Sequence, residues 1–155
     1  MTTFWRISNH VDLSGKGGRG FSARWHTAGR PIVYLADCPA GALLERIVHM
    51  TDMLEDANLP SFYQLLQISV PDELAIKSLN TIAPTDWKER LEFTRNLGDS
   101  WLVSRETALA RVPSAIAPQT WNYLLNPEHP GAKQVVVAEV IREQFDNRLF
   151  RFGRG

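Results

Sequence analysis

The chain has 155 residues, 44% of them hydrophobic and 10% aromatic, which is enough apolar material to bury one sizeable core. Basic and acidic residues number 17 each, so no net field draws the chain to nucleic acid or to an acidic membrane. The one cysteine cannot form an internal disulfide, and neither a signal peptide nor a membrane-spanning apolar run is found. These features predict a single cytoplasmic domain over residues 1–155, without direct contact to nucleic acid or membrane.

The expected elements of the first half are strands and one helix. Aromatic and β-branched residues predict strands at residues 3–7, 31–36 and 63–70, with a short extended segment at 21–26. Within the second strand, Ile32 and Tyr34 share one face of the sheet. Residues 40–55 carry apolar side chains at helical spacing, and Pro39 is an acceptable entry residue, so a helix is predicted there.

The second half predicts short helices followed by short strands. The charge pattern fits helices at residues 86–93 and 94–104, although Gly98 has low helix propensity. Strands are expected at residues 108–112, 121–125 and 135–141, separated by prolines. The fold class is therefore α+β, a compact domain with a mixed, mostly antiparallel sheet.

A glycine-rich segment follows the first expected strand. Gly15, Gly17 and Gly20 match the pattern G-x-G-x-x-G, but an extended segment follows them where a dinucleotide-binding fingerprint requires a helix. The segment is not a P-loop either, because Lys16 precedes a glycine and not a serine or threonine. We expect a mobile loop; closure over a phosphate through backbone N–H groups, with Lys16 or Arg19, is the alternative.

Metal sites and nucleophiles leave no recognisable pattern. The four histidines occur singly, at positions 10, 26, 49 and 129, so we expect no metal and assign each a structural or surface role. Cys38 precedes the expected helix and is predicted to be a small buried thiol, with activation by the helix N-terminus as the alternative. No G-x-S-x-G elbow is present.

Three residues around the second strand form a candidate site. Taken singly, Arg24 fits a surface ion pair, Tyr34 a half-buried strand aromatic, and Glu45 a carboxylate favoured by the helix dipole. A helical wheel places Glu45 nearly opposite the apolar stripe, so it is either solvated or lines a cleft. Downstream, residues 112–115 and 122–130 contain prolines and asparagines that are typical of strand ends and turns.

The stretch ARWHTAGRPIVYLADCPAGALLERIVH, with VPSA and NYLLNPEHP downstream, resembles the RES domain, a family named for its characteristic Arg, Glu and Ser. The resemblance covers nearly the whole chain. It assigns the family's arginine, tyrosine, glutamate and serine to Arg24, Tyr34, Glu45 and Ser114. The sequence departs from the commoner pattern by having Ala23 before the arginine and His26 in the place of an asparagine.

The resemblance implies a fold like that of ADP-ribosyltransferases and NAD⁺ as substrate, and the single histidines predict that no metal is needed. Glu45 is then expected to stabilise the oxocarbenium character that develops when the nicotinamide–ribose bond breaks. Arg24 offers a bidentate fork to the pyrophosphate or its ribose, and Tyr34 offers its ring face or its hydroxyl to the nicotinamide end. Further NAD-binding residues are expected at Ser114, Asn126, Arg6 and His26.

The function implied by the resemblance is that of a toxin in a toxin-antitoxin pair. It would cleave NAD⁺ and transfer ADP-ribose to a host protein, such as an enzyme of nucleotide synthesis. An Xre-like helix-turn-helix antitoxin would cover the active site. The alternatives are an NAD⁺ glycohydrolase or phosphorylase that depletes NAD⁺, and a noncatalytic module that binds a nucleotide or a partner.

Overall fold

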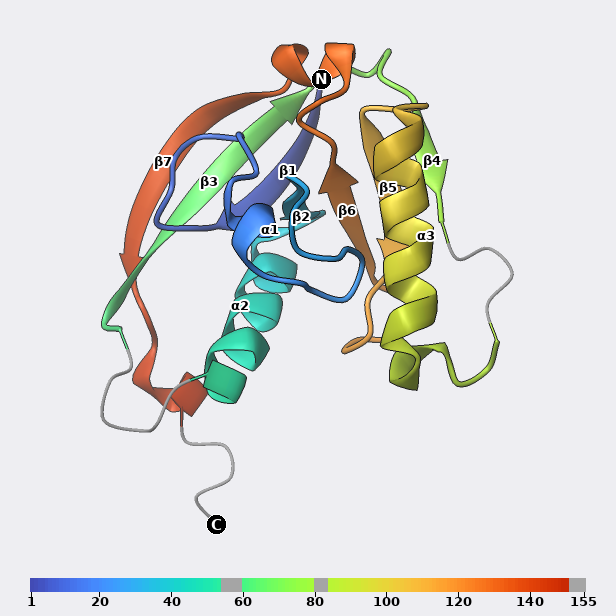
Figure 1. The fold of residues 1–155 in the computed structure, drawn as a ribbon. Coiled ribbons are helices and arrows are strands. Elements are labelled where there is room, and N and C mark those ends of the chain that lie inside the picture. The colour runs from blue at the N-terminus through green and yellow to red at the C-terminus, as the bar shows by residue number, and fades with distance from the viewer. Residues whose placement is uncertain (54–59, 80–83, 151–155) are drawn as a thin grey trace.

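The computed structural model describes residues 1–53, 60–79 and 84–150, and within them the strands form one twisted sheet (Figure 1). The strands are β1 (Thr2–Ile7), β2 (Val33–Ala36), β3 (Phe62–Val70), β4 (Ile76–Ser78), β5 (Leu109–Pro113), β6 (Trp121–Leu125) and β7 (Val136–Gln144). Their order across the sheet is β4-β5-β6-β2-β1-β3-β7. The pairing of β4 with β5 is parallel and the other pairings are antiparallel. The predicted α+β class with a mixed, mostly antiparallel sheet is confirmed.

The helices are α1 (Gly17–Gly20), α2 (Pro39–Met53) and α3 (Leu91–Ser104), with 3-10 turns η2 (Trp87–Glu89), η3 (Pro130–Gln134) and η4 (Asn147–Phe150). In the described part of the chain, no helix is long and apolar enough to cross a bilayer. The first turn of α2 is closed by Cys38, whose Sγ accepts a hydrogen bond from the Gly41 N–H at 3.3 Å. Cys38 is exposed, so the prediction of a buried thiol is wrong; its sulfur is drawn to the unpaired N–H groups of the helix start.

Two hydrophobic clusters divide the interior between the faces of the sheet. Val33 and Leu35 belong to a cluster with side chains from β1, β3, β5 and β6. Ile32 belongs to the other cluster, against which Tyr34 packs. Successive strand residues point to opposite faces, so the predicted alternation in this segment is confirmed.

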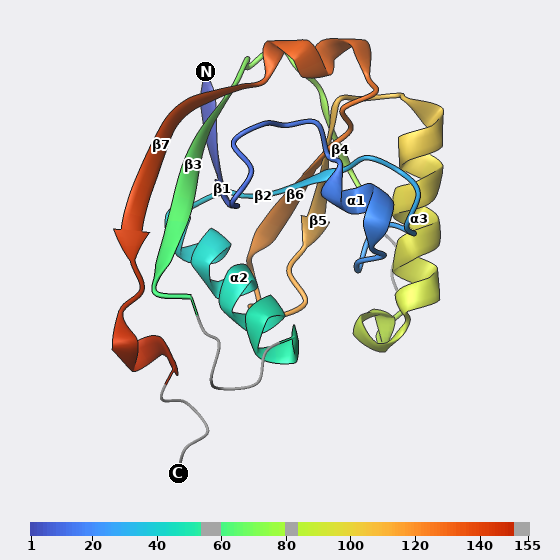
Figure 2. The same cartoon turned by 60° about the vertical axis from the view of Figure 1, so that its left-hand side comes forward.

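Helices α2 and α3 lie on the same side of the sheet, with α1 and the loops around it between them (Figures 1 and 2). The register between β2 and β6 supports this placement of the two helices, because Tyr34 pairs with Leu124 and Ala36 pairs with Asn122. Leu124 packs with residues of α3, whereas the α2 backbone at Gly41 lies over Ala36. The stretch of β2 and β6 between the two helices therefore faces the segment that carries Arg24.

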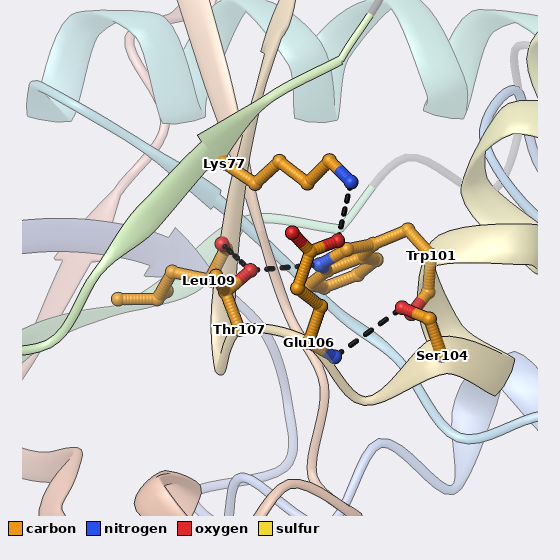
Figure 3. Close-up of polar contacts among 6 residues, drawn as sticks. All are labelled: Lys77, Trp101, Ser104, Glu106, Thr107 and Leu109. Atoms are coloured by element: carbon orange, nitrogen blue, oxygen red, sulfur yellow. Dashed lines mark hydrogen bonds and ion pairs between the residues drawn. The ribbon is translucent and has the colours of Figure 1, made fainter.

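The end of α3 is fastened to β4 and β5 by side chains (Figure 3). The indole N–H of Trp101 donates to the Thr107 hydroxyl at 3.0 Å, and this hydroxyl donates to the carbonyl oxygen of Leu109 at 2.7 Å. Lys77 on β4 forms an ion pair with Glu106. Because Trp101 is 2% exposed and its N–H is satisfied, α3 is held at a fixed position on the sheet.

The glycine-rich segment differs from the expected mobile loop, because it contains the helical turn α1 and packs closely on the chain. Gly15 has φ of +70°, and a Cβ there would lie 2.6 Å from the Ile32 backbone nitrogen. A Cβ at Gly18 would lie 2.6 Å from the Ile32 Cγ2. Gly15 and Gly18 therefore allow close packing, and Gly15 also allows a left-handed backbone conformation.

Three further segments differ from the sequence prediction. Within the segment 21–26, residues 23–26 form a turn closed by an isolated bridge between Ala23 and His26, where an extended segment was expected. The expected helix at 86–93 is the 3-10 turn η2, and α3 begins at Leu91. The short strand β4 was not expected, because three residues carry too little alternation to be recognised.

Candidate functional site

Glu45 on α2 is held by two side chains from the end of the β5–β6 hairpin. Its Oε1 accepts a hydrogen bond from Asn122 Nδ2 at 2.7 Å and one from the Ser114 hydroxyl at 3.0 Å. The Ser114 oxygen in turn accepts from the N–H groups of Ile116 and Ala117 at 3.1 and 3.2 Å. These two donors occupy the lone pairs of the serine oxygen, so its single hydrogen is directed at Glu45.

The hairpin explains why these donors meet. Asn122 pairs with Val112, and the Ser114 N–H donates to the Thr120 carbonyl at 2.9 Å just beyond the last strand pair. Ser114 is only 5% exposed, and Glu45 is half-buried. A carboxylate in this position keeps its interactions in surroundings of lower dielectric than open water.

The Tyr34 hydroxyl lies in a buried hydrogen-bond chain. Nε2 of His26 lies 2.9 Å from the Gly18 carbonyl, which only accepts, so Nε2 carries a hydrogen. In the neutral ring Nδ1 is then an acceptor, and the Tyr34 hydroxyl donates to it at 2.7 Å. The same oxygen accepts from the Trp25 N–H at 3.3 Å. Of the two roles expected for Tyr34, this geometry favours the ring face, because the hydroxyl already has partners.

Burial raises the pKa of the Tyr34 phenol well above its ordinary value, and the Trp25 N–H opposes this change. The neutral phenol is therefore the form at physiological pH, as its donation to His26 requires. His26 itself is 2% exposed and links the glycine segment to β2. The structure thus assigns His26 a supporting position behind Tyr34.

Arg24 lies in the turn between Ala23 and His26. Its Nη1 donates to the Lys88 carbonyl at 2.8 Å, and its guanidinium carbon lies 5.9 Å from the centre of the Trp87 ring. Among the ion pairs of the described residues, none includes Arg24. The guanidinium therefore has N–H groups left over for an anion, whereas a partner carboxylate would have occupied them.

The turn that carries Arg24 is seated directly on α3. A Cβ at Gly98 would lie 1.6 Å from the Trp25 carbonyl oxygen, so no larger residue fits without movement of the backbone. Thr94 donates from its hydroxyl to the Arg24 carbonyl at 2.6 Å, and Arg95 Nε donates to the Ala23 carbonyl at 2.7 Å. The position of Arg24 is thus set by contacts between α3 and the main-chain carbonyls of the turn.

Two of the expected NAD-binding residues lie outside this group. Arg6 follows Trp5, which pairs with Ala36, so Arg6 projects from the face opposite Tyr34. It donates to the Asp12 carbonyl at 3.1 Å, and burial lowers the pKa of its guanidinium from the ordinary value.

Asn126 is 1% exposed and lies at the other end of β6 from Asn122. Its Nδ2 donates to the Leu102 carbonyl at 3.0 Å, and its Oδ1 accepts from the Glu128 N–H at 3.1 Å. These bonds join α3 to the turn after β6. The structure therefore brings Arg24, Tyr34, Glu45, Ser114 and His26 to one side of the sheet. Asn126 lies on the same side but at the far end of β6, against α3, and Arg6 lies on the opposite side.

Asn122 is the residue that the sequence reasoning missed. The segment NYLLNPEHP was interpreted as turn-forming, although residues 121–125 were correctly predicted as a strand. Alternation in that strand places Asn122 on the same face as Leu124, which is a buried face. A polar side chain on a buried face needs a partner, and that signal was available in the sequence.

Two surface depressions lie away from this group. Depressions of about 400 and 470 Å³ lie on α3 and around its first turn, and neither is lined by Arg24, Tyr34 or Glu45. Within residues 1–53, 60–79 and 84–150, no three His, Cys, Asp or Glu side chains are grouped in a way that would hold a metal ion. The hydrogen-bond chemistry of the group identifies it as the candidate site.

Comparison with known proteins agrees with the motif. The family model of the RES domain matches residues 3–147. A protein from Pseudomonas putida named Toxin Res is 45% identical, with 94% of this chain and 98% of that relative covered. A protein from a Sphingobium species named Prs ADP-ribosylating toxin is 37% identical, with 97% and 98% covered.

Among solved structures, a chain of the M. tuberculosis MbcT-MbcA toxin-antitoxin complex shares the fold. The TM-score is 0.67 at 21% identity, with 92% of this chain and 84% of that chain covered. The match of the family model over nearly the whole length, together with these relatives, identifies the sequence: the chain belongs to the RES domain family.

Proposed function

We propose that this chain is the toxin of a toxin-antitoxin pair and that it cleaves the nicotinamide–ribose bond of NAD⁺. The observation that carries the proposal is the Glu45 carboxylate, held by Ser114 and Asn122 on the sheet face that Tyr34 shares and that the turn with Arg24 contacts. The names of the Pseudomonas and Sphingobium relatives support a toxin, and the second name supports ADP-ribosylation.

The proposed chemistry assigns each residue a distinct task. Nicotinamide leaves as a neutral molecule with the bonding electron pair, and positive charge develops on the ribose carbon and its ring oxygen. Glu45 stabilises this charge directly or by holding the ribose hydroxyls. Arg24 binds the pyrophosphate or its ribose with its unpaired N–H groups, and Tyr34 supports the nicotinamide end with its ring face. No metal takes part in this scheme.

The acceptor of ADP-ribose is proposed to be a protein. Transfer and hydrolysis share the bond-breaking step and differ in which nucleophile then reaches the ribose carbon. The name of the Sphingobium relative favours transfer, and an enzyme of nucleotide synthesis is the target class we propose. The exposed face of the segment at Lys16 and Arg19 is a surface on which such an acceptor can dock.

A cognate antitoxin is the second proposed partner. The solved chain that shares this fold belongs to a toxin-antitoxin complex. We propose that an Xre-like helix-turn-helix antitoxin covers the face that carries Glu45, and that the single domain acts in the cytoplasm without contacting nucleic acid or membrane itself.

A time course of nicotinamide released from NAD⁺ by the purified protein tests the proposal. We expect release by wild type, and labelling of one or a few bands when labelled NAD⁺ and a bacterial lysate are added. Free ADP-ribose in step with nicotinamide and no labelled protein would replace transfer by hydrolysis, and phosphorylated ADP-ribose in phosphate buffer would indicate a phosphorylase. Absence of any nicotinamide would leave a noncatalytic binding module.

A further inference from the structure

Glu45 presents its two carboxylate oxygens unequally. Both Asn122 and Ser114 donate to Oε1, and the described residues show no hydrogen bond to Oε2. The donors are neutral, so the pair of bonds fixes the orientation of the carboxylate without cancelling its charge. Oε1 thus fixes the orientation of the carboxylate, and Oε2 remains available to accept a hydrogen bond from a ligand.

We infer that Asn122 is a positioning residue for the proposed NAD⁺ cleavage, and that it clamps Oε1 so that Oε2 is presented to the ribose. The inference rests on the proposed function. Asn122 lies on β6 opposite Ala36, the residue over which the α2 backbone passes, so the strand holds it directly beneath the helix that carries Glu45. Its bond to Glu45 is the shorter of the two at 2.7 Å.

The oxygen of the Asn122 amide does not substitute for its nitrogen here. A carboxylate only accepts, so an oxygen facing Oε1 would repel it, and the nitrogen must be the contacting atom. Removal of this donor leaves Ser114 alone to orient the carboxylate, while the negative charge remains. The expected loss is therefore in the orientation of Glu45, which affects the reacting state more than substrate binding.

Kinetics of two Asn122 variants separate positioning from packing. We expect Asn122→Ala to lower kcat about 10-fold to 100-fold, as for a lost hydrogen bond to a charged group, with KM changed less than about 3-fold. Asn122→Asp keeps the shape but sets a second carboxylate against Glu45, so it should be slower than Asn122→Ala. A packing role predicts the opposite order. Tyr123→Phe, on the same strand and the other face, is the control and should retain wild-type kcat.

The contact itself is tested without turnover. The side-chain amide signals of Asn122 are identified in a ¹H–¹⁵N spectrum by their loss in Asn122→Asp, and Glu45→Gln should shift them strongly in the otherwise intact protein. Unshifted signals, or full kcat in Asn122→Ala, would overturn the inference. If wild type releases no nicotinamide, the proposed function fails, and the spectrum alone decides whether Asn122 clamps Glu45.

Discussion

The two sides of the candidate site are held by different means. Glu45 is oriented by side chains, because Ser114 and Asn122 both donate to its Oε1. Arg24 is placed through the main chain of its own turn, since the carbonyls of residues 23, 24 and 25 all contact α3, two of them as acceptors from the side chains of Arg95 and Thr94. Substitution of Ser114 or Asn122 should therefore change the orientation of Glu45, whereas changes in the packing of α3 should displace the turn that carries Arg24.

The largest effect is expected for the charge of Glu45. Glu45→Gln keeps an oxygen for Ser114 and Asn122 but removes the negative charge, so nicotinamide release should fall about 100-fold to 1,000-fold. The midpoint of thermal unfolding should change by only a few degrees, because the residue is half-buried and its contacts are kept. Glu73→Gln, at an exposed position, is the control. Near-normal release by Glu45→Gln would remove this residue from the mechanism.

The position of Arg24 should be sensitive to the packing of its turn on α3. Gly98→Ala sets a methyl group against the Trp25 carbonyl, where an ideal Cβ would lie at 1.6 Å, so α3 and the turn must separate. We expect a loss of about 3 kcal/mol in the free energy of unfolding, at the upper end for overpacking, measured by urea denaturation. Gly20→Ala is the matched control, because a Cβ there meets nothing within 4 Å. Equal stability of the two variants would contradict the contact between α3 and this turn.

A smaller effect is expected when Arg24 keeps its charge. Arg24→Lys retains a cation but not the planar fork, so we expect KM for NAD⁺ to rise about 10-fold with little change in kcat. Arg148→Lys, in an exposed ion pair with Asp146, should leave both constants unchanged. If Arg24→Lys instead lowered kcat alone, Arg24 would act on the reacting bond and not on the phosphates.

Two parts of the site, Tyr34 and Glu45, could be placed from the sequence. Alternation over residues 31–36 gave the correct face for Tyr34, and helical spacing gave α2 with Glu45 off the apolar stripe. Both signals are local. The partner of Glu45 on β6 is 77 residues away, and nothing in the local pattern of α2 specifies it.

Arg24 was expected on an extended segment and lies in a turn. Its position depends on contact between that turn and Gly98, a glycine that at the sequence level only reduces helix propensity. Propensity describes a helix alone, whereas this glycine serves the packing of another segment against the helix. Long-range contacts of this kind explain why the positions of Arg24 and Asn122 in the site do not follow from the local pattern around Glu45.

The smallest effect concerns Tyr34, which belongs to both sides because it lies on β2 and is bonded to the Arg24 turn. Burial raises its pKa in the folded state, whereas the unfolded chain has the ordinary value of 10.0. Above about pH 10 the unfolded state therefore loses a proton that the folded state keeps, so folding stability is fully present below that pH and falls as the pH rises, by at most about 1.4 kcal/mol per pH unit. Tyr34→Phe removes this contribution. Urea denaturation of both proteins from about pH 8 to pH 11 should show the wild type losing stability more steeply than the variant above pH 10, and parallel curves would contradict a buried Tyr34 hydroxyl.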